Sequence, residues 1–378
     1  MADAGTTRLN SLLTQCVKHG ASDLHLTPGL PPYARIEGDL VPMPNEAVLV
    51  PEDTATLSKT IVQLVKASEE SLTLKGAIDG ALTSPDGVRF RFNIFKRQNE
   101  LAIVIRQLEE RFRSLSELGL PESLHSLSDL RDGLVVVSGP TGAGKSTTLA
   151  TLINRINQSR KCHIITIEDP IEYIHKPIKS VVNQRQIGLD APTFNDALVS
   201  SLRQDPDVIL VGEIRDLDTI RTAITAAETG HLVFTTLHAG DCVSSIERLV
   251  SVFPADEQDG IRRQLSIVLR AIVAQHLLPS CDSNQAGRVS TSEVLMVNPA
   301  IANLIASGKS AQIYSSMEAG SAFGMQTLEQ DLARLWVTGR ISEITAVGTT
   351  RNVSVLRDRA TMMRTRRPTS VMSAGGMR

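Results

Sequence analysis

The first hundred residues carry short runs of apolar positions with either helical or strand spacing. Apolar side chains recur with helical spacing between residues 9 and 18, and Gly20 follows as a stop. A second helix is expected over residues 54–68. Alternation of apolar and polar residues, with turn residues between the runs, predicts strands over 22–26, 33–36, 39–41, 76–82, 88–95 and 101–108. This mixture predicts an N-terminal α+β domain covering residues 1–110.

The pattern changes after residues 111–132, a charged and polar stretch that is interpreted as a linker. Helical segments then separate four short runs rich in β-branched residues, which are expected to be strands over 134–138, 162–167, 208–211 and 232–236. Alternation of strands and helices is typical of a mainly parallel sheet with helices on its faces. A second domain is therefore predicted over residues 133–356.

The C-terminal third shows helical rather than strand patterns. Residues 253–278 and 300–338 are expected to be mostly helical. Residues 357–378 are rich in Arg, Met, Ser and Gly without any period, which predicts a disordered tail.

Composition narrows the class of protein without identifying it. Hydrophobic residues make up 42% and the net charge is −2, which favours a globular protein over a dedicated nucleic-acid binder. Aromatic residues, at 3%, are too few for an extended base-stacking surface. The four cysteines form no C-x-x-C pair, which argues against a zinc site or a disulfide framework. Since neither a signal peptide nor a run of about 20 apolar residues is found, a cytoplasmic location is expected.

An octapeptide after the first strand of the second domain fits the pattern G-x-x-x-x-G-K-[ST]. It consists of Gly139, Pro140, Thr141, Gly142, Ala143, Gly144, Lys145 and Ser146, and Thr147 opens the helix expected over 147–156. Glycines let backbone N–H groups curl around phosphate oxygens, and the helix N-terminus adds the positive end of its dipole. Lys145 is suited to the β- and γ-phosphates, and the Ser146 hydroxyl to Mg²⁺. The octapeptide predicts a site for ATP with Mg²⁺.

Two further strands of this domain end in carboxylates. Residues 208–211 run through Gly212 into Glu213, and a P-loop enzyme needs an acid at this edge to hold Mg²⁺ directly or through water. The strand over 162–167 leads into Glu168, the candidate for orienting the attacking water. The segment Asp169-Pro170 can also form a turn or a helix cap, and both interpretations can hold together.

Two histidines flank the fourth strand of the domain. His231 precedes residues 232–236 and His238 follows them. A histidine at the edge where the other strands end can sense the γ-phosphate and couple nucleotide state to motion. A lone histidine is more often structural, so this role depends on the convergence of several strand ends.

Four segments together resemble the Walker A, Asp box, Walker B and His box of type II and type IV secretion ATPases. These are residues 139–147, 164–172, 202–216 and 229–239. The stretches 20–40, 244–254 and 324–330 are similar to the PilT-type pilus retraction ATPases within that group. The resemblance covers roughly residues 9–345.

The resemblance implies a fold, an assembly and a set of site residues. The fold would be an α/β one, with an N-terminal PAS-like domain joined by a linker to a RecA-like P-loop ATPase domain. The assembly would be a homohexameric ring with ATP at subunit interfaces. The matching site residues are Glu168 for the water, Glu213 for Mg²⁺ and water, His231 and His238 of the His box, and Arg91 and Arg106, which the N-terminal domain turns toward the nucleotide. From the residues alone Arg91 is not distinguished from Arg89, which lies on the same face of its strand.

One segment departs from the retraction pattern. Such ATPases carry a late A-I-R-N-L-I-R-E motif, whereas residues 300–307 here read A-I-A-N-L-I-A-S. The apolar positions of the motif are kept, whereas its two arginines and its glutamate are absent. The segment can therefore still pack against the core, although it has lost a charged surface.

The leading functional hypothesis is a motor for type IV pilus retraction. Its expected partners are an inner-membrane platform protein and a paralogous pilus ATPase, with indirect contact at the inner face of the inner membrane and no nucleic acid. The alternatives are an extension or type II secretion assembly ATPase, an accessory paralogue of the retraction ATPase and a nucleic-acid translocase. Assembly ATPases usually have a longer N-terminal region and a tetracysteine metal site, neither of which this sequence contains.

Overall fold

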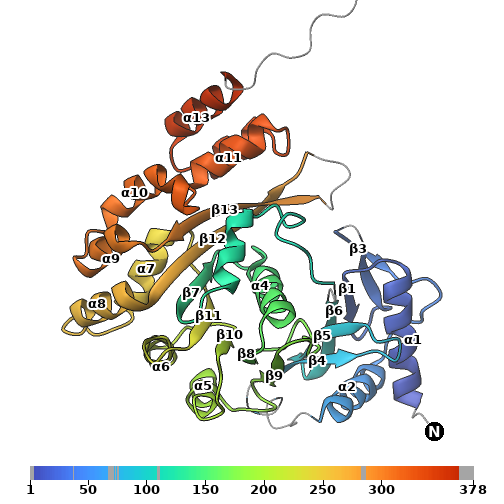
Figure 1. Ribbon diagram of the computed structural model, residues 1–378. Helices are drawn as coiled ribbons and strands as arrows, with labels where there is room; N and C mark the ends of the chain where they lie inside the picture. The colour runs from blue at the N-terminus through green and yellow to red at the C-terminus, as the bar shows by residue number, and fades with distance from the viewer. Residues whose placement is uncertain are drawn as a thin grey trace, which may run out of the picture. The chain divides into compact units, whose positions relative to one another are not determined.

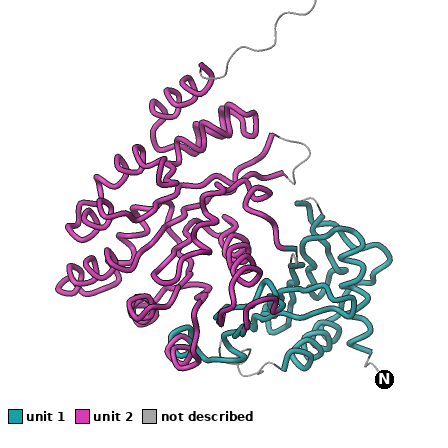
Figure 2. Tube along the Cα trace, in the orientation of Figure 1, with its two compact units in different colours: residues 1–111, 166–176, 183–197 teal, residues 112–165, 177–182, 198–378 magenta. Residues whose placement is uncertain are grey.

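A computed structural model describes residues 4–365, except residue 37, residues 67–71, 73 and 75, residues 109–110 and residues 282–286 (Figure 1). The chain divides into two compact units (Figure 2). Unit 1 comprises residues 1–111, 166–176 and 183–197, and unit 2 comprises residues 112–165, 177–182 and 198–378. Two stretches from the middle of the chain therefore group with the N-terminal residues.

Unit 1 is built on a six-stranded sheet with the order β3-β2-β1-β6-β5-β4, in which neighbouring strands pair antiparallel. The strands are β1 (Asp23–Leu26), β2 (Tyr33–Ile36), β3 (Asp39–Pro42), β4 (Ala77–Thr83), β5 (Arg89–Arg97) and β6 (Glu100–Gln107). The helices are α1 (Ala4–Lys18) and α2 (Pro51–Val65). All six predicted strands and both predicted helices are present, although residues 67 and 68 of the second predicted helix lie outside the described residues.

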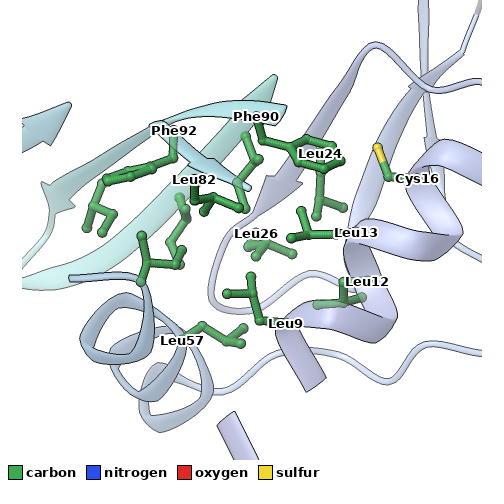
Figure 3. Packing of buried hydrophobic residues seen from close by; sticks show 14 of the residues in the cluster. Leu9, Leu12, Leu13, Cys16, Leu24, Leu26, Leu57, Leu82, Phe90 and Phe92 are labelled. Carbon is green, nitrogen blue, oxygen red and sulfur yellow. The ribbon is translucent and has the colours of Figure 1, made fainter. Parts of the chain in front are cut away.

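The core of unit 1 lies between the two helices and one face of the sheet (Figure 3). Leu9 and Leu13 of α1 share this core with Leu24 of β1, while Phe90 and Phe92 are contributed by alternate positions of β5. All five side chains are fully buried. Burial of each such side chain stabilises the fold by about 1.5–3 kcal/mol. Because only alternate positions of a strand face the core, an alternating apolar pattern in the sequence predicts these strands.

The second sheet has seven strands in the order β13-β12-β7-β11-β10-β8-β9. They are β7 (Gly133–Ser138), β8 (His163–Glu168), β9 (Val181–Gln186), β10 (Val208–Val211), β11 (Leu232–Leu237), β12 (Leu269–Pro279) and β13 (Arg288–Met296). β7 pairs parallel with both β11 and β12, and β10 pairs parallel with β11. The helices along this part of the chain are α4 (Lys145–Ser159), α5 (Phe194–Ser201), α6 (Leu217–Glu228), α7 (Cys242–Ser251) and α8 (Gln258–Val268). The predicted alternation of strands and helices is confirmed.

Three strands of this sheet were not predicted. The helical prediction for residues 253–278 is wrong after Val268, because β12 begins at Leu269. β12 forms a long antiparallel pair with β13, from Ala271 opposite Met296 to Pro279 opposite Arg288. The buried run Ala271–Ala274 is continuously apolar, and such a run cannot be told from a buried helix by its period alone.

The C-terminal region is helical, as predicted for residues 300–338. It contains α9 (Pro299–Ala306), α10 (Ile313–Ala319), α11 (Leu328–Val337), α12 (Glu343–Thr349) and α13 (Val353–Thr365). The prediction of a disordered tail is wrong for residues 357–365, which form most of α13. Leu356 and Ala360, four residues apart, bury one side of α13 in a cluster with Leu332 and Leu335 of α11. Residues 366–378 lie outside the described residues.

The described helices are short. The longest, α1, α2 and α4, have 15 residues each, whereas a bilayer-spanning helix needs about 20 apolar residues. Within the described ranges no helix has the length and apolar character to cross a membrane.

Candidate nucleotide site

The octapeptide 139–146 forms the turn between β7 and α4 in unit 2, as predicted. Gly139 has a φ of 145°, and a Cβ atom at this position would lie 2.3 Å from the carbonyl oxygen of Gln275. Only glycine fits such a close approach. Gly144, with a φ of 89°, is the N-cap residue of α4. The loop therefore delivers the chain to a helix N-terminus, where unpaired N–H groups and the helix dipole favour phosphate.

Lys145 folds back over this loop. Its Nζ donates to the carbonyl oxygens of Gly139 at 2.9 Å and Pro140 at 3.1 Å. The residue is only 8% exposed, whereas Ser146 beside it is exposed. The ammonium group is thus held inside the loop, and the Ser146 hydroxyl is accessible to a ligand.

Glu213 and His238 are brought together at the ends of β10 and β11. The Nε2 atom of His238 lies 3.0 Å from Oε1 of Glu213, and Nε of Arg215 donates to the same oxygen. Burial, followed by the positive charge of Lys145, lowers the pKa of His238, while Glu213 opposes this shift. A mainly neutral ring at pH 7 can donate its Nε2–H to Glu213.

The backbone around this pair is fixed by neighbouring side chains. Arg248 of α7 donates from Nη1 to the carbonyl oxygen of His238 at 2.9 Å, and Thr236 donates to the carbonyl oxygen of Gly212 at 2.6 Å. The positions of His238 and Glu213 therefore depend on both β11 and α7.

The residues at this edge fit a magnesium–nucleotide complex. Mg²⁺ in such sites takes a few oxygen ligands from the protein and others from substrate phosphates and water. Ser146 supplies an exposed hydroxyl, and Glu213 a carboxylate whose side chain is 18% exposed. Within the described part of the chain no group of three or more His, Cys, Asp or Glu side chains is placed to hold a metal ion.

Glu168, the last residue of β8, has its own set of partners within unit 1. Its Oε1 accepts from Thr166 Oγ1 at 2.7 Å and from Gln184 Nε2 at 3.2 Å. Burial raises the pKa of Glu168 to about 6, although these two hydrogen bonds act in the opposite direction. A carboxylate that titrates near neutral pH is suited to take up a proton during catalysis.

The structure does not bring His231 to the site formed by His238. In the parallel sheet, Leu232 pairs with Gly133 and Leu237 pairs with Ser138, so His231 lies at the opposite end of β11 from the phosphate loop. Six strand residues correspond to about 20 Å. Its Nδ1 lies 2.9 Å from the carbonyl oxygen of Ala226, at the end of α6. This contact is a local structural one.

The predicted arginines lie side by side on unit 1. The sheet register places Arg91 of β5 opposite Arg106 of β6, and Arg106 opposite Asp23 of β1. Nε of Arg106 donates to Oδ1 of Asp23 at 2.7 Å, and Arg91 lies 4.0 Å from Asp79. The Arg106 side chain is largely exposed and the Arg91 side chain is about half-buried. Arg89, the alternative on the same strand, instead donates to the carbonyl oxygen of Ile171 at 2.7 Å.

Three side chains that shape these sites were not singled out from the sequence: Arg215, Arg248 and Gln184. Arg215 follows Glu213 by two residues and was visible only as part of the segment 202–216. Arg248 was likewise visible only as part of the segment 244–254. The contacts of Arg248 and Gln184 reach residues 10 and 16 positions earlier in the chain, and the local pattern does not reveal them.

Comparison with known proteins places the sequence among secretion ATPases. Residues 6–338 match the family described as Type II/IV secretion system protein. The chain is 43% identical to the type IV pilus retractation ATPase PilT of Pseudomonas aeruginosa over 339 residues, which cover 88% of this chain and 95% of that protein. It is 39% identical to the type IV pilus ATPase PilU of the same organism over 332 residues, covering 88% and 85%.

The structure is also similar to a solved one. The crystal structure of the pilus retraction motor PilT with bound ADP matches with a TM-score of 0.84 and 39% identity. The match covers 93% of this chain and 99% of that chain.

Proposed function

This chain belongs to the type II/IV secretion system protein family, and we propose that it is the ATPase that powers retraction of a type IV pilus. The observation that carries the proposal is its match, over almost the whole of both chains, to a pilus retraction motor. The phosphate loop and the Glu213–His238 pair supply the chemistry that such a motor needs.

Phosphate binding begins at Lys145. Its Nζ is held by the carbonyl oxygens of Gly139 and Pro140, which are weaker partners for an ammonium group than a phosphate oxygen. We infer that the β- and γ-phosphates of ATP take over these contacts, while backbone N–H groups from Gly142 to Thr147 surround the phosphate chain.

The metal would be held by Ser146 and Glu213, directly or through water. When bound, Mg²⁺ neutralises charge on the phosphates. His238 and Arg215 hold the carboxylate of Glu213 from one side, which fixes the direction in which it can face a ligand. His238 thereby links the metal site to β11 and to the loop after it.

Water activation is assigned to Glu168. Its pKa of about 6 leaves it mostly ionised at pH 7, yet makes it a better proton acceptor than an ordinary glutamate. Arg91 and Arg106 are proposed to neutralise charge on the γ-phosphoryl group from the N-terminal domain, because planar guanidinium groups bind phosphate in a bidentate manner.

The assembly that we propose is the one that the family resemblance implies. We propose a homohexameric ring at the cytoplasmic face of the inner membrane, bound to a pilus platform protein and assisted by a paralogous pilus ATPase. The second candidate is an accessory paralogue of the retraction ATPase; the chain is also 39% identical to a second type IV pilus ATPase, PilU. The altered segment of α9 is relevant to the choice between a retraction motor and an accessory subunit. Ile301 and Ile305 are buried and can still pack, whereas Ala302 and Ala306 occupy partly exposed positions and leave that surface without charge.

Purified full-length protein tests the motor assignment. We expect Mg²⁺-dependent hydrolysis of ATP and, by light scattering with nucleotide present, a particle of about six subunits. A strict monomer at micromolar concentration would contradict the ring, and absent turnover in an intact hexamer would favour an accessory subunit. Strong, salt-sensitive stimulation by DNA would instead favour a translocase.

A further inference from the structure

One glutamine of β9 holds Glu168 together with the segment that follows it. Nε2 of Gln184 donates to Oε1 of Glu168 at 3.2 Å and to the carbonyl oxygen of Tyr173 at 2.8 Å. Its own Oε1 accepts from the backbone N–H of His175 at 2.8 Å. Both amide hydrogens and the amide oxygen are thus used. The side chain connects the carboxylate to two points of the segment 169–176.

The two side-chain donors to Glu168 converge on a single oxygen. Thr166 Oγ1 donates to Oε1 at 2.7 Å, and Gln184 donates to the same atom. Two donors on one oxygen restrict rotation of the carboxylate. Such restriction matters for a group that orients water, because a misdirected lone pair lowers the rate even when substrate is bound.

We propose that Gln184 is the positioning residue of the hydrolytic step, orienting Glu168 and coupling that orientation to the segment 169–176. The inference rests on the role proposed for Glu168. Gln184 acts through the carboxylate and is assigned no contact with ATP.

The charges around Glu168 make this role measurable. Burial and the charge of Glu172 raise the pKa of Glu168, whereas the hydrogen bonds from Thr166, Gln184 and the backbone of Glu172 lower it. Burial lowers the pKa of the His175 ring to about 4, so that ring stays neutral near pH 7. Removal of the Gln184 donor should therefore shift the titration of Glu168 to higher pH.

The test compares two substitutions of Gln184 with a matched control on the same strand. Gln184→Met removes all three bonds, whereas Gln184→Glu keeps an acceptor for the His175 N–H and places a carboxylate beside Glu168. The control is Gln186→Met, because the Gln186 side chain accepts a 3.4 Å bond from the N–H of Ile171. That substitution disturbs the same segment without removing the donor to Glu168.

We expect kcat for ATP hydrolysis to fall about 10- to 100-fold in Gln184→Met, the loss typical of a hydrogen bond to a charged group. The KM for ATP should stay within about twofold. The acid limb of the kcat–pH profile should move to higher pH in Gln184→Met, and further in Gln184→Glu because like charges oppose ionisation. Gln186→Met should keep the wild-type profile.

Two results would overturn the inference. In the first, both Gln184 variants match the control in kcat and in pH profile. In the second, kcat and the melting temperature fall together while the acid limb of the kcat–pH profile stays in place, and this result would indicate a purely structural role for Gln184. Glu168→Gln separates this inference from the proposed function. Full turnover by Glu168→Gln would remove the role of Glu168 itself, whereas its inactivity beside fully active Gln184 variants would remove only the role of Gln184.

Discussion

If Glu168 accepts the proton of the attacking water, acidification below neutral pH should slow hydrolysis. Burial raises the pKa of Glu168 to about 6, from an ordinary value of 4.5. With a pKa near 6, about 90% of the group is ionised at pH 7 and about 10% at pH 5, so kcat should fall about tenfold over this range. An unperturbed glutamate would lose only about 1.3-fold.

The assay is the kcat–pH profile between pH 5 and 8, measured at saturating ATP and repeated in single-turnover mode, so that slow product release cannot hide the chemical step. Glu168→Gln should have low residual activity with no limb near pH 6. A wild-type kcat that stays constant down to pH 5 would refute the assignment, because it requires a base with an ordinary pKa or no base at all.

The raised pKa of Glu168 also predicts that acidification, which slows hydrolysis, makes the folded protein more stable. A carboxyl whose pKa is raised in the folded state contributes stability below its unfolded pKa, and this contribution is lost as pH rises through about 6. At pH 7 the ionised group therefore costs up to about 2 kcal/mol, since one pKa unit corresponds to about 1.4 kcal/mol. Glu168→Gln should raise the melting temperature at pH 7 but not at pH 4. Equal melting temperatures at pH 7 would contradict the raised pKa.

Three further substitutions test the phosphate loop, the end of β10 and a buried ion pair. Lys145→Ala should weaken ATP binding at least about 100-fold in a fluorescent-nucleotide titration, because it removes the positive charge inside the phosphate loop; unchanged binding would remove the core of the site. Glu213→Gln should bind ATP normally yet lose about 100-fold or more in kcat, and retained turnover would refute its role. Arg351→Met should lower the free energy of unfolding by about 2–4 kcal/mol in denaturant titration, because Arg351 Nη2 lies 3.1 Å from Oε2 of Glu293, which is 1% exposed. Burial already raises the pKa of Glu293 and Arg351 opposes this, so the loss should shrink as pH falls and the carboxyl is protonated.

Most of the fold could be predicted because its strands obey simple periods. The alternation in β5 and the buried run of β10 indicate one-sided and two-sided burial, respectively. The expected fold class, a RecA-like P-loop ATPase with an N-terminal α/β domain, is confirmed by the structural match. The β12–β13 pair was not predicted, because the continuously apolar run in β12 also fits a buried helix and its parallel partner β7 lies far away in the sequence.

The candidate site was predictable where chemistry is tied to local sequence. The phosphate loop needs a fixed order of glycines, Lys145 and a hydroxyl, and a strand that ends in Glu213 follows from parallel topology. His231 was expected at the site because it matches the His box, but it precedes β11, and the parallel register therefore places it at the opposite edge of the sheet from His238. Gln184 was not found because its importance comes from three contacts in space.

If this chain drives pilus retraction, deletion of its gene in the organism that carries it should change the number of surface pili, which can be counted directly. We expect abundant pili that fail to retract, with wild-type behaviour restored by the intact gene but not by the Glu213→Gln variant. Cells without pili would contradict the account and identify an assembly motor. Unchanged pili and normal retraction would also contradict it, and would favour an accessory subunit.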